Sequence, residues 1–177
     1  MEKQRHIQNL ALVGFMGTGK TTIGKMVAET LRFTFVDTDE MIEARTGKTI
    51  AQIFAGDGEP KFREMERLMV DELADRNKSV ISTGGGLPVF GDNLDRLKLH
   101  SLTICLWSSP EKIYERVRTQ THRPLLHEPD PLAKIRELLA VREPFYRRAD
   151  VLVNTELRSA REVAQQIIHH FHTARAA

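Results

Sequence analysis

The stretch "GFMGTGKT", Gly14 to Thr21, follows a short apolar run and precedes a segment of helical period. It fits the pattern G-x-x-x-x-G-K-[ST], in which glycines let backbone N–H groups turn toward phosphate oxygens. The N-terminus of the next helix adds partial positive charge, Lys20 reaches the β- and γ-phosphates, and the Thr21 hydroxyl ligates Mg²⁺. The stretch therefore predicts a strand, a phosphate loop and a helix that together bind a nucleoside triphosphate with Mg²⁺. The residues predicted to bind it are Gly17, Thr18, Gly19, Lys20, Thr21 and Thr22.

The rest of the chain repeats this alternation of strand and helix. Short runs rich in β-branched residues alternate with longer stretches of helical period, which is typical of βαβ units and a parallel sheet. The candidate strands are "LALVGF", "TFVDT", "SVIST", "LTICLW" and "DVLVNT". Capping boxes are predicted at Thr49 and Ser159, a helix start at Ser109, and a helix stop at Gly47. The pattern predicts an α/β fold.

Composition limits the classes of protein that the chain can be. With 177 residues and 41% apolar content, residues 1–177 are expected to form a single domain. Lys and Arg number 26 against 24 Asp and Glu, so no basic field for nucleic acid is expected. Cys105 is expected to be a buried small hydrophobe. With no signal peptide or membrane span in view, we expect no membrane partner and a soluble, cytoplasmic protein. No extended apolar stripe argues for an obligate oligomer, so we expect a monomer.

The acceptor of the phosphate must be found elsewhere in the chain. A guanine-reading N-K-x-D segment is absent, which disfavours a GTPase. In "VDTDEM", Asp37 and Asp39 point the same way if the strand continues through them, toward the edge where ligands of α/β sheets bind. Asp37 could hold Mg²⁺ through water, and Asp39 could accept the proton of an attacking hydroxyl. The alternative is that Asp39 caps a helix starting at Met41.

Three arginines and a second glycine run are weaker signals. Arg63 in "GEPKFREMERL" has the planar fork that suits a carboxylate, but taken alone it fits a solvated helix residue better, and Arg142 in "VREPFYRRAD" is unremarkable alone. Arg123 lies in the irregular segment "TQTHRPLLHEPDP", residues 119–131, where a mobile lid could bring it to the phosphate. The run "STGGGLPV" has no ionisable group, so it is a turn or a surface against which a ligand lies.

Taken in order, these segments resemble one family. "GFMGTGKTTIG", "FVDTDEMIE", "GEPKFREMERL", "STGGGLPV", "RPLL" and "REPFYRRAD" together are similar to shikimate kinase, from about Leu10 to Ile168. The resemblance implies a P-loop, nucleoside-monophosphate-kinase-like three-layer fold, with a five-stranded parallel sheet flanked by helices and a lid. It implies transfer of the γ-phosphate of ATP to the 3-hydroxyl of shikimate, with Mg²⁺ as cofactor. The substrate-binding region is then about residues 37–63, and the lid about residues 119–131.

The resemblance also implies roles for individual residues. Asp39 is implied to contact the ring hydroxyls and act as the base, while Arg63 and Arg142 grip the carboxylate. The glycine run is implied to contact the substrate through its backbone, the residues being Gly84, Gly85 and Gly86. Two buried arginines without an anionic ligand would be unfavourable, so the free pocket is expected to be empty, solvated or closing.

On the nucleotide side, the resemblance implies that Lys20 and Arg123 are catalytic and meet the phosphates. Thr21 is implied to hold Mg²⁺, alongside Asp37. The adenine contact stays open between Arg158, before the last helix, and Arg118, before the lid. His122 and His127 flank "RPLL". They could make the lid sensitive to pH, or they could be ordinary solvated loop histidines, and the sequence leaves both interpretations open.

Two other functions remain possible at this point. Another small-molecule kinase of the same fold, such as a gluconate or nucleotide kinase, would phosphorylate an acceptor without a carboxylated polyol ring. A non-catalytic, nucleotide-dependent regulatory protein would have lost one of the proposed site residues. All five are present: Lys20, Asp39, Arg63, Arg123 and Arg142.

Overall fold

A computed structural model describes residues 5–120 and 127–176. Five strands form one parallel sheet in the order β2-β3-β1-β4-β5. The strands are β1 (Asn9–Val13), β2 (Thr34–Asp37), β3 (Ser79–Ser82), β4 (Ser101–Trp107) and β5 (Val151–Asn154). The predicted strands are all confirmed, with ends that differ by one or two residues.

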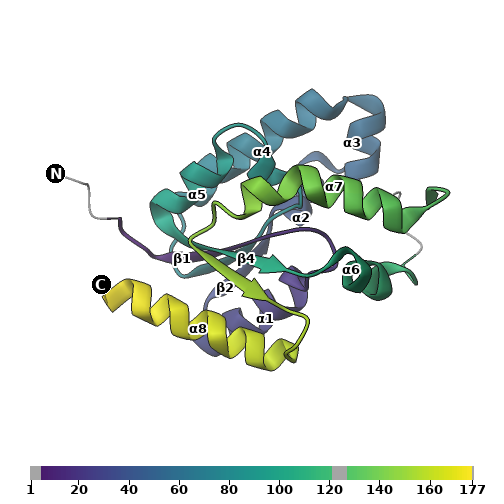
Figure 1. The fold of residues 1–177 in the computed structure, drawn as a ribbon. Helices are drawn as coiled ribbons and strands as arrows, with labels where there is room; N and C mark the ends of the chain where they lie inside the picture. The colour runs from purple at the N-terminus through teal and green to yellow at the C-terminus, as the bar shows by residue number, and fades with distance from the viewer. Residues whose placement is uncertain (1–4, 121–126, 177) are drawn as a thin grey trace.

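Helices connect the strands and cover both faces of the sheet. They are α1 (Lys20–Leu31), α2 (Thr38–Thr46), α3 (Ile50–Gly56), α4 (Glu59–Leu73), α5 (Asn93–His100), α6 (Pro110–Val117), α7 (Pro131–Tyr146) and α8 (Ala160–Ala176), with a short 3₁₀ helix η1 (Leu87–Val89). Figure 1 shows the central sheet between these two layers of helices. The predicted α/β three-layer architecture is confirmed.

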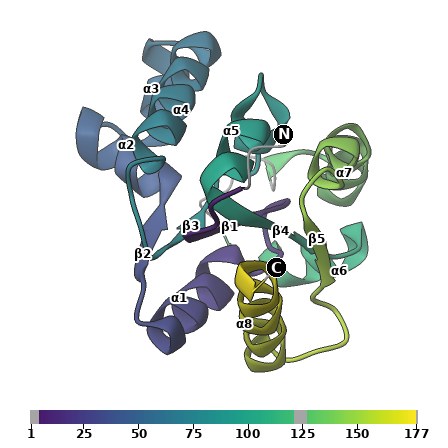
Figure 2. The same cartoon turned by 90° about the vertical axis from the view of Figure 1, so that its left-hand side faces the viewer.

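The sheet is buried because each layer supplies an apolar face. Figure 2, which looks along the strands, shows α1 and α8 below the sheet and α4, α5 and α7 above it. Below, α8 buries Val163, Ile167 and Phe171 completely against α1 and the strands. Above, Phe62, Met69 and Leu73 of α4 are buried against β1, β3 and α5.

The helix ends follow the predicted local chemistry. Thr49 and Gln52 form a complete capping box at the start of α3. Ser109 caps α6 by accepting from the backbone N–H of Lys112, with Pro110 as the first helical residue. Gly47 ends α2 with a positive φ of 66°, which a residue without a β-carbon adopts easily. These local signals fix where the connecting loops begin.

Strand order decides which loops meet. From β1 the chain crosses to β2 on one side, and from β3 it crosses to β4 on the other, so the direction of winding reverses beside β1. Ligands of open α/β sheets bind at the carboxyl edge near such a reversal. Leu10 of β1 is in register with Val80 of β3 and Leu102 of β4. The loops after β1 and β3 therefore lie side by side at one edge.

None of the helices within residues 5–120 and 127–176 combines the length and apolar character needed to cross a bilayer. Cys105 is buried in β4, as predicted, and burial raises its thiol pKa to about 12.

Candidate active site

The phosphate loop joins β1 to α1 at the carboxyl edge of the sheet. Gly17 and Gly19 adopt positive φ angles of 73° and 98°, which turn the backbone around the loop. The Lys20 ammonium donates to the carbonyl oxygens of Gly14 and Phe15, each at 2.8 Å. Lys20 is also the first residue of α1, so its charge adds to that of the helix N-terminus. The loop has the geometry of an anion cradle.

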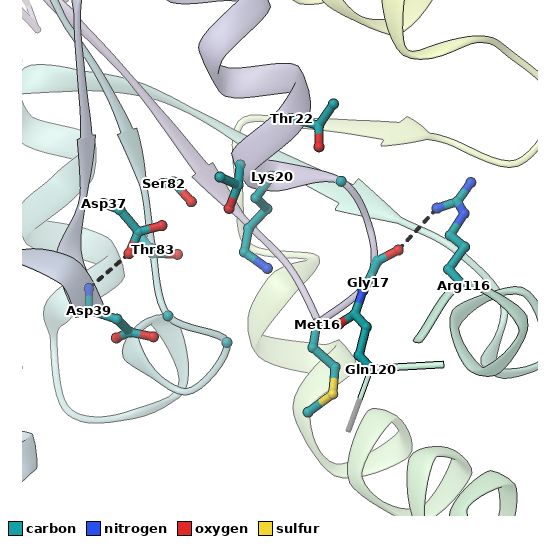
Figure 3. Close-up of a pocket in the computed structure, with 14 residues that line it drawn as sticks. Met16, Gly17, Lys20, Thr22, Asp37, Asp39, Ser82, Thr83, Arg116 and Gln120 are labelled. Atoms are coloured by element: carbon teal, nitrogen blue, oxygen red, sulfur yellow. Dashed lines mark hydrogen bonds between the residues drawn. The ribbon is translucent and has the colours of Figure 1, made fainter. Parts of the chain in front are cut away.

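A cavity of about 460 Å³ opens beside this loop. Its walls come from the phosphate loop, the end of β2, the end of β3 with the glycine run, and the end of α6. Figure 3 shows Lys20 reaching into the cavity between Asp37 and Asp39 on one side and Met16 and Gln120 on the other. The structure thus brings the phosphate loop and the acceptor candidates to one space.

The two aspartates reach that cavity differently from the prediction. The strand ends at Asp37, whose carboxylate caps α2 by accepting from the backbone N–H groups of Asp39 (3.0 Å) and Glu40 (3.3 Å). Asp39 lies in the first turn of α2 and does not cap a helix at Met41. The idea of a continuing strand is therefore wrong, because the Asp37 cap begins the helix at once. Both carboxylates still line the cavity.

Asp39 has the environment of a carboxylate tuned to accept a proton. Its pKa is raised from 3.8 to about 6, chiefly by burial and then by the nearby Asp37 carboxylate, while the Lys20 ammonium opposes both effects. Its Oδ1 is buried and finds no hydrogen-bond partner in the described parts of the chain. A carboxyl group with a pKa near physiological pH and an open acceptor atom is suited to general base catalysis.

Arg63 is held rigidly rather than solvated. Its side chain is only 17% exposed, and its guanidinium donates to Glu66 at 2.7 Å and to Glu59 at 2.8 and 3.1 Å. Cζ of Arg63 lies over the Phe90 ring, 3.8 Å from its centre, which is within the range of a cation–π contact. In the free protein α4 itself thus supplies two carboxylate partners for Arg63, a pairing that was not predicted from the sequence.

Glu66 was not predicted from the sequence, although a signal was present. It lies four residues after Phe62 and three before Met69, so it falls on the apolar face of α4, where it is 1% exposed. Burial raises its pKa to about 7, while the hydrogen bond from Arg63 lowers it. A charged residue on the buried face of a helix indicates a partner, here Arg63.

Arg142 approaches from the opposite side on α7. Its guanidinium lies 5.7 Å from the ring centre of Phe15 in the phosphate loop. One turn later, the Tyr146 hydroxyl donates to the carbonyl of Gly85 at 2.6 Å, and burial raises the Tyr146 pKa to about 12. Tyr146 thus ties α7 to the glycine run and fixes where Arg142 stands. Tyr146 was not predicted either, since its partner is 61 residues away in sequence.

Each glycine of the run faces a different side chain. A β-carbon on Gly84 would lie 2.6 Å from Oδ1 of Asp39, and one on Gly86 would lie 2.6 Å from Nη1 of Arg63. At Gly85, the nearest contact would be an ordinary 3.6 Å to Nη1 of Arg142. None of these three glycines has a positive φ, so the backbone conformation does not require glycine here. The close approach of neighbouring side chains is the reason for glycine. The run is the surface on which the acceptor candidates converge, not only a turn.

This geometry predicts unequal effects of alanine along the run. Gly84→Ala and Gly86→Ala should each lower kcat/KM for the acceptor about 10- to 100-fold, because a displacement of about 1 Å at a reacting group costs on that order. Gly85→Ala should cost about tenfold or less by the same reasoning, chiefly through KM. Steady-state kinetics of the three variants test this ranking. A Gly85→Ala protein more impaired than the other two would contradict it.

A second hollow of about 240 Å³ lies on the other side of the phosphate loop. Arg158 lines it, as does Arg116 of α6, which also lines the main cavity. The Arg116 guanidinium donates to the carbonyl of Gly17 (3.2 Å) and to the hydroxyl (3.0 Å) and carbonyl (2.7 Å) of Thr155. Arg118 is exposed at the end of α6 and lines neither hollow. Of the two arginines considered for the adenine contact, Arg158 lines this hollow and Arg118 does not. Arg116, which was not predicted from the sequence, lines it as well.

The predicted lid is only partly described. Arg123 and His122 lie outside the described residues, and His127 lies just after the gap. Pro131, expected to end an irregular segment, is instead the first residue of α7, and Asp130 caps that helix. A cap followed by proline is a common helix start, so the irregular segment is shorter than predicted.

Thr21 and Asp37 fit the ligand set of a Mg²⁺ ion. Both line the cavity beside Lys20. Within residues 5–120 and 127–176, no group of three or more His, Cys, Asp or Glu side chains could hold a metal without further ligands. Mg²⁺ is commonly held by one or two protein oxygens together with phosphate oxygens and water, so this sparse set matches a nucleotide-bound ion.

The fold and the site together define a P-loop kinase that acts on a small anionic acceptor. The phosphate loop and Asp39 line one cavity, and Arg63 and Arg142 approach the glycine run that borders it. A family model described as shikimate kinase matches residues 16–172. The chain belongs to the shikimate kinase family.

Curated relatives agree over nearly the whole chain. A shikimate kinase of Thermodesulfovibrio yellowstonii is 44% identical over 93% of this chain and 95% of its own length. A shikimate kinase of Hahella chejuensis is 43% identical over 95% of this chain and 88% of its own length.

Two solved structures show the difference between a member of the family and a protein that shares only the fold. A shikimate kinase from Acinetobacter baumannii in complex with shikimate superposes with a TM-score of 0.89 at 37% identity, covering 98% of this chain and 97% of that one. A gluconokinase from Sinorhizobium meliloti reaches a TM-score of 0.63 at 17% identity, covering 97% and 96%. The second likeness shows the shared fold alone.

Proposed function

We propose that this chain transfers the γ-phosphate of ATP to the 3-hydroxyl of shikimate, giving shikimate 3-phosphate. The observation that carries the proposal is the meeting of two loops at one cavity. The phosphate loop with Lys20 forms one wall, and Asp39 with the glycine run forms the other. A donor and an acceptor held between these walls would face each other without covalent help from the protein, which suits phosphoryl transfer.

In this proposal, Asp39 accepts the proton of the attacking hydroxyl. Its raised pKa of about 6 leaves it ionised at neutral pH and close enough to that pH to take a proton efficiently. Lys20 stabilises the charge that develops on the transferring phosphoryl group. Arg123, expected on the lid, is proposed to meet the same phosphates. A Mg²⁺ ion held by Thr21 and Asp37 would neutralise phosphate charge.

Arg63 and Arg142 are proposed to bind the carboxylate of shikimate. Their positions against Gly86 and Gly85 support this, because they face one glycine surface from α4 and α7. Planar guanidinium groups bind carboxylates through paired hydrogen bonds. The backbone of the run Gly84–Gly86 is proposed to support the ring.

Arg158 and Arg116 are proposed to border the adenine and the phosphates. Arg116→Ala should raise the KM for ATP about 10- to 100-fold, the scale expected for hydrogen bonds from a charged group. Arg118→Ala, on the same helix but exposed, is the matched control and should change the KM for ATP less than about twofold, as surface changes usually do. Initial rates over a range of ATP concentrations give both values. A larger effect at Arg118 would reverse the assignment.

The proposal also includes Mg²⁺ as the metal, a monomeric enzyme and a cytoplasmic location. The sparse ligand set at Thr21 and Asp37 supports the choice of metal. The state of assembly can be read from the mass in solution by light scattering.

The test of the function is ADP release with ATP and Mg²⁺ across several acceptors. Shikimate should support turnover, whereas gluconate and nucleoside monophosphates should not, because they do not present a carboxylated ring with hydroxyls. Turnover with gluconate or a nucleotide in preference to shikimate would favour another kinase of this fold. ATP binding without turnover on any acceptor would favour a regulatory protein.

A further inference from the structure

Arg63 carries a second carboxylate partner at the open side of the acceptor site. Oε1 of Glu59 accepts from both Nε (3.1 Å) and Nη2 (2.8 Å) of Arg63, so one oxygen spans an entire edge of the guanidinium. Oε2 of Glu66 accepts a hydrogen bond from the remaining terminal nitrogen, Nη1, at 2.7 Å. In the free protein, Arg63 is therefore already bound by two carboxylates of its own helix.

The two glutamates differ in how readily they can leave. The Glu66 side chain is 1% exposed, so the protein encloses it almost completely. The Glu59 side chain is 51% exposed and lies at the first residue of α4, where water and the helix N-terminus can both stabilise its charge. Exposed ion pairs of this spacing are weak, so little is lost when such a pair opens.

When an acceptor carboxylate binds Arg63, the balance of charge favours the departure of one of the two glutamates from the guanidinium. Glu59 alone neutralises the single positive charge of Arg63, and Glu66, whose pKa burial raises to about 7, adds further negative charge, so a substrate carboxylate would meet a guanidinium that is already neutralised. Like charges this close repel strongly in a partly buried site. The stacked ring of Phe90 and the buried Glu66 keep the guanidinium in place while its other edge exchanges partners.

We propose that Glu59 is a displaceable counter-ion of Arg63, which competes with the acceptor carboxylate and so sets the affinity for the acceptor. In the free protein Glu59 neutralises Arg63 and holds its plane. When an anionic acceptor arrives, Glu59 swings to solvent and the acceptor takes its edge of the guanidinium. This inference rests on the proposed function, since it assumes that Arg63 binds the carboxylate of shikimate.

The decisive variant is Glu59→Gln, which removes the charge but keeps an oxygen that can accept from Arg63. The matched control is Glu64→Gln on the same helix, because Glu64 pairs with Lys61 and not with Arg63. Shikimate binding to each protein is measured by titration calorimetry without nucleotide. Glu59→Gln should bind shikimate about 3- to 10-fold more tightly, the range expected when one competing charge is removed at a partly exposed pair. Glu64→Gln should match the unaltered protein.

The methyl ester of shikimate separates charge competition from any other effect. It lacks the carboxylate charge, so Glu59→Gln should leave its affinity unchanged. Unchanged or weaker binding of shikimate by Glu59→Gln would overturn the inference, and so would equal tightening for the ester. Absence of shikimate phosphorylation by the unaltered protein would instead overturn the proposed function, and the inference with it.

Discussion

Replacing Asp39 by asparagine should lower kcat for shikimate phosphorylation by about 10²- to 10⁴-fold, the range that a positioned general base contributes. Asparagine keeps the size of the side chain and its place against Gly84, but it cannot take up the proton of the attacking hydroxyl. The KM for ATP should change little, because Lys20 and the phosphate loop are unaltered. Single-turnover measurements would separate the chemical step from product release.

The pH dependence gives the same prediction a sharper form. Burial and the neighbouring Asp37 raise the pKa of Asp39 to about 6, so the fraction of ionised base falls as the pH drops through that value. The kcat/KM of the unaltered protein should therefore fall on the acid side with an apparent pKa near 6, and this limb should vanish in Asp39→Asn. Glu40→Gln, an exposed neighbour on α2, serves as the control and should keep the limb.

Glu66 provides the competing explanation for an acid limb. Its pKa of about 7 lies close enough to that of Asp39 for the two groups to titrate together. A limb that persists in Asp39→Asn but disappears in Glu66→Gln would show that binding through Arg63, and not the base, controls the profile.

Replacing Arg63 by alanine should raise the KM for shikimate by about 30- to 1,000-fold, the scale seen when one partner of a buried charge pair is removed. Two effects add. The acceptor carboxylate loses its guanidinium, and the buried Glu66 is left without the donor that stabilises its charge. Affinity for ATP should stay near normal, since Arg63 faces Gly86 and not the phosphate loop.

Three variants make that experiment specific. Arg142→Ala should also raise the KM for shikimate, but it does not leave a buried glutamate without its hydrogen-bond donor. Arg63→Lys should recover part of the loss, because a lysine carries the charge without the planar fork. Arg67→Ala, exposed on the same helix, should have no effect on either substrate. Equal loss of ATP and shikimate binding in Arg63→Ala would contradict the division between donor and acceptor walls.

The sequence could predict the elements whose causes are local. Each of these elements depends on a few consecutive residues, and the structure confirms them: the phosphate loop, the strands, the capping box at Thr49 and the helix stop at Gly47. The start of α2 was predicted wrongly, because both aspartates of "VDTD" can cap a helix and only the packed structure selects Asp37. For the adenine contact, the sequence could not choose between Arg158 and Arg118, because the hollow that Arg158 lines forms only where segments distant in sequence pack together.

The sequence by itself thus determined the alternating α/β fold, the phosphate loop and the family to which the chain belongs, because these depend on short-range geometry and on motifs in a fixed order. Only the tertiary structure decided which side chains share a site. Across long separations in sequence, Gly84 faces Asp39 and Gly86 faces Arg63. Likewise, the Tyr146 hydroxyl donates to the carbonyl of Gly85. Strand order and helix packing create those contacts and shift the pKa of Asp39 by excluding water, and neither effect can be read from neighbouring residues.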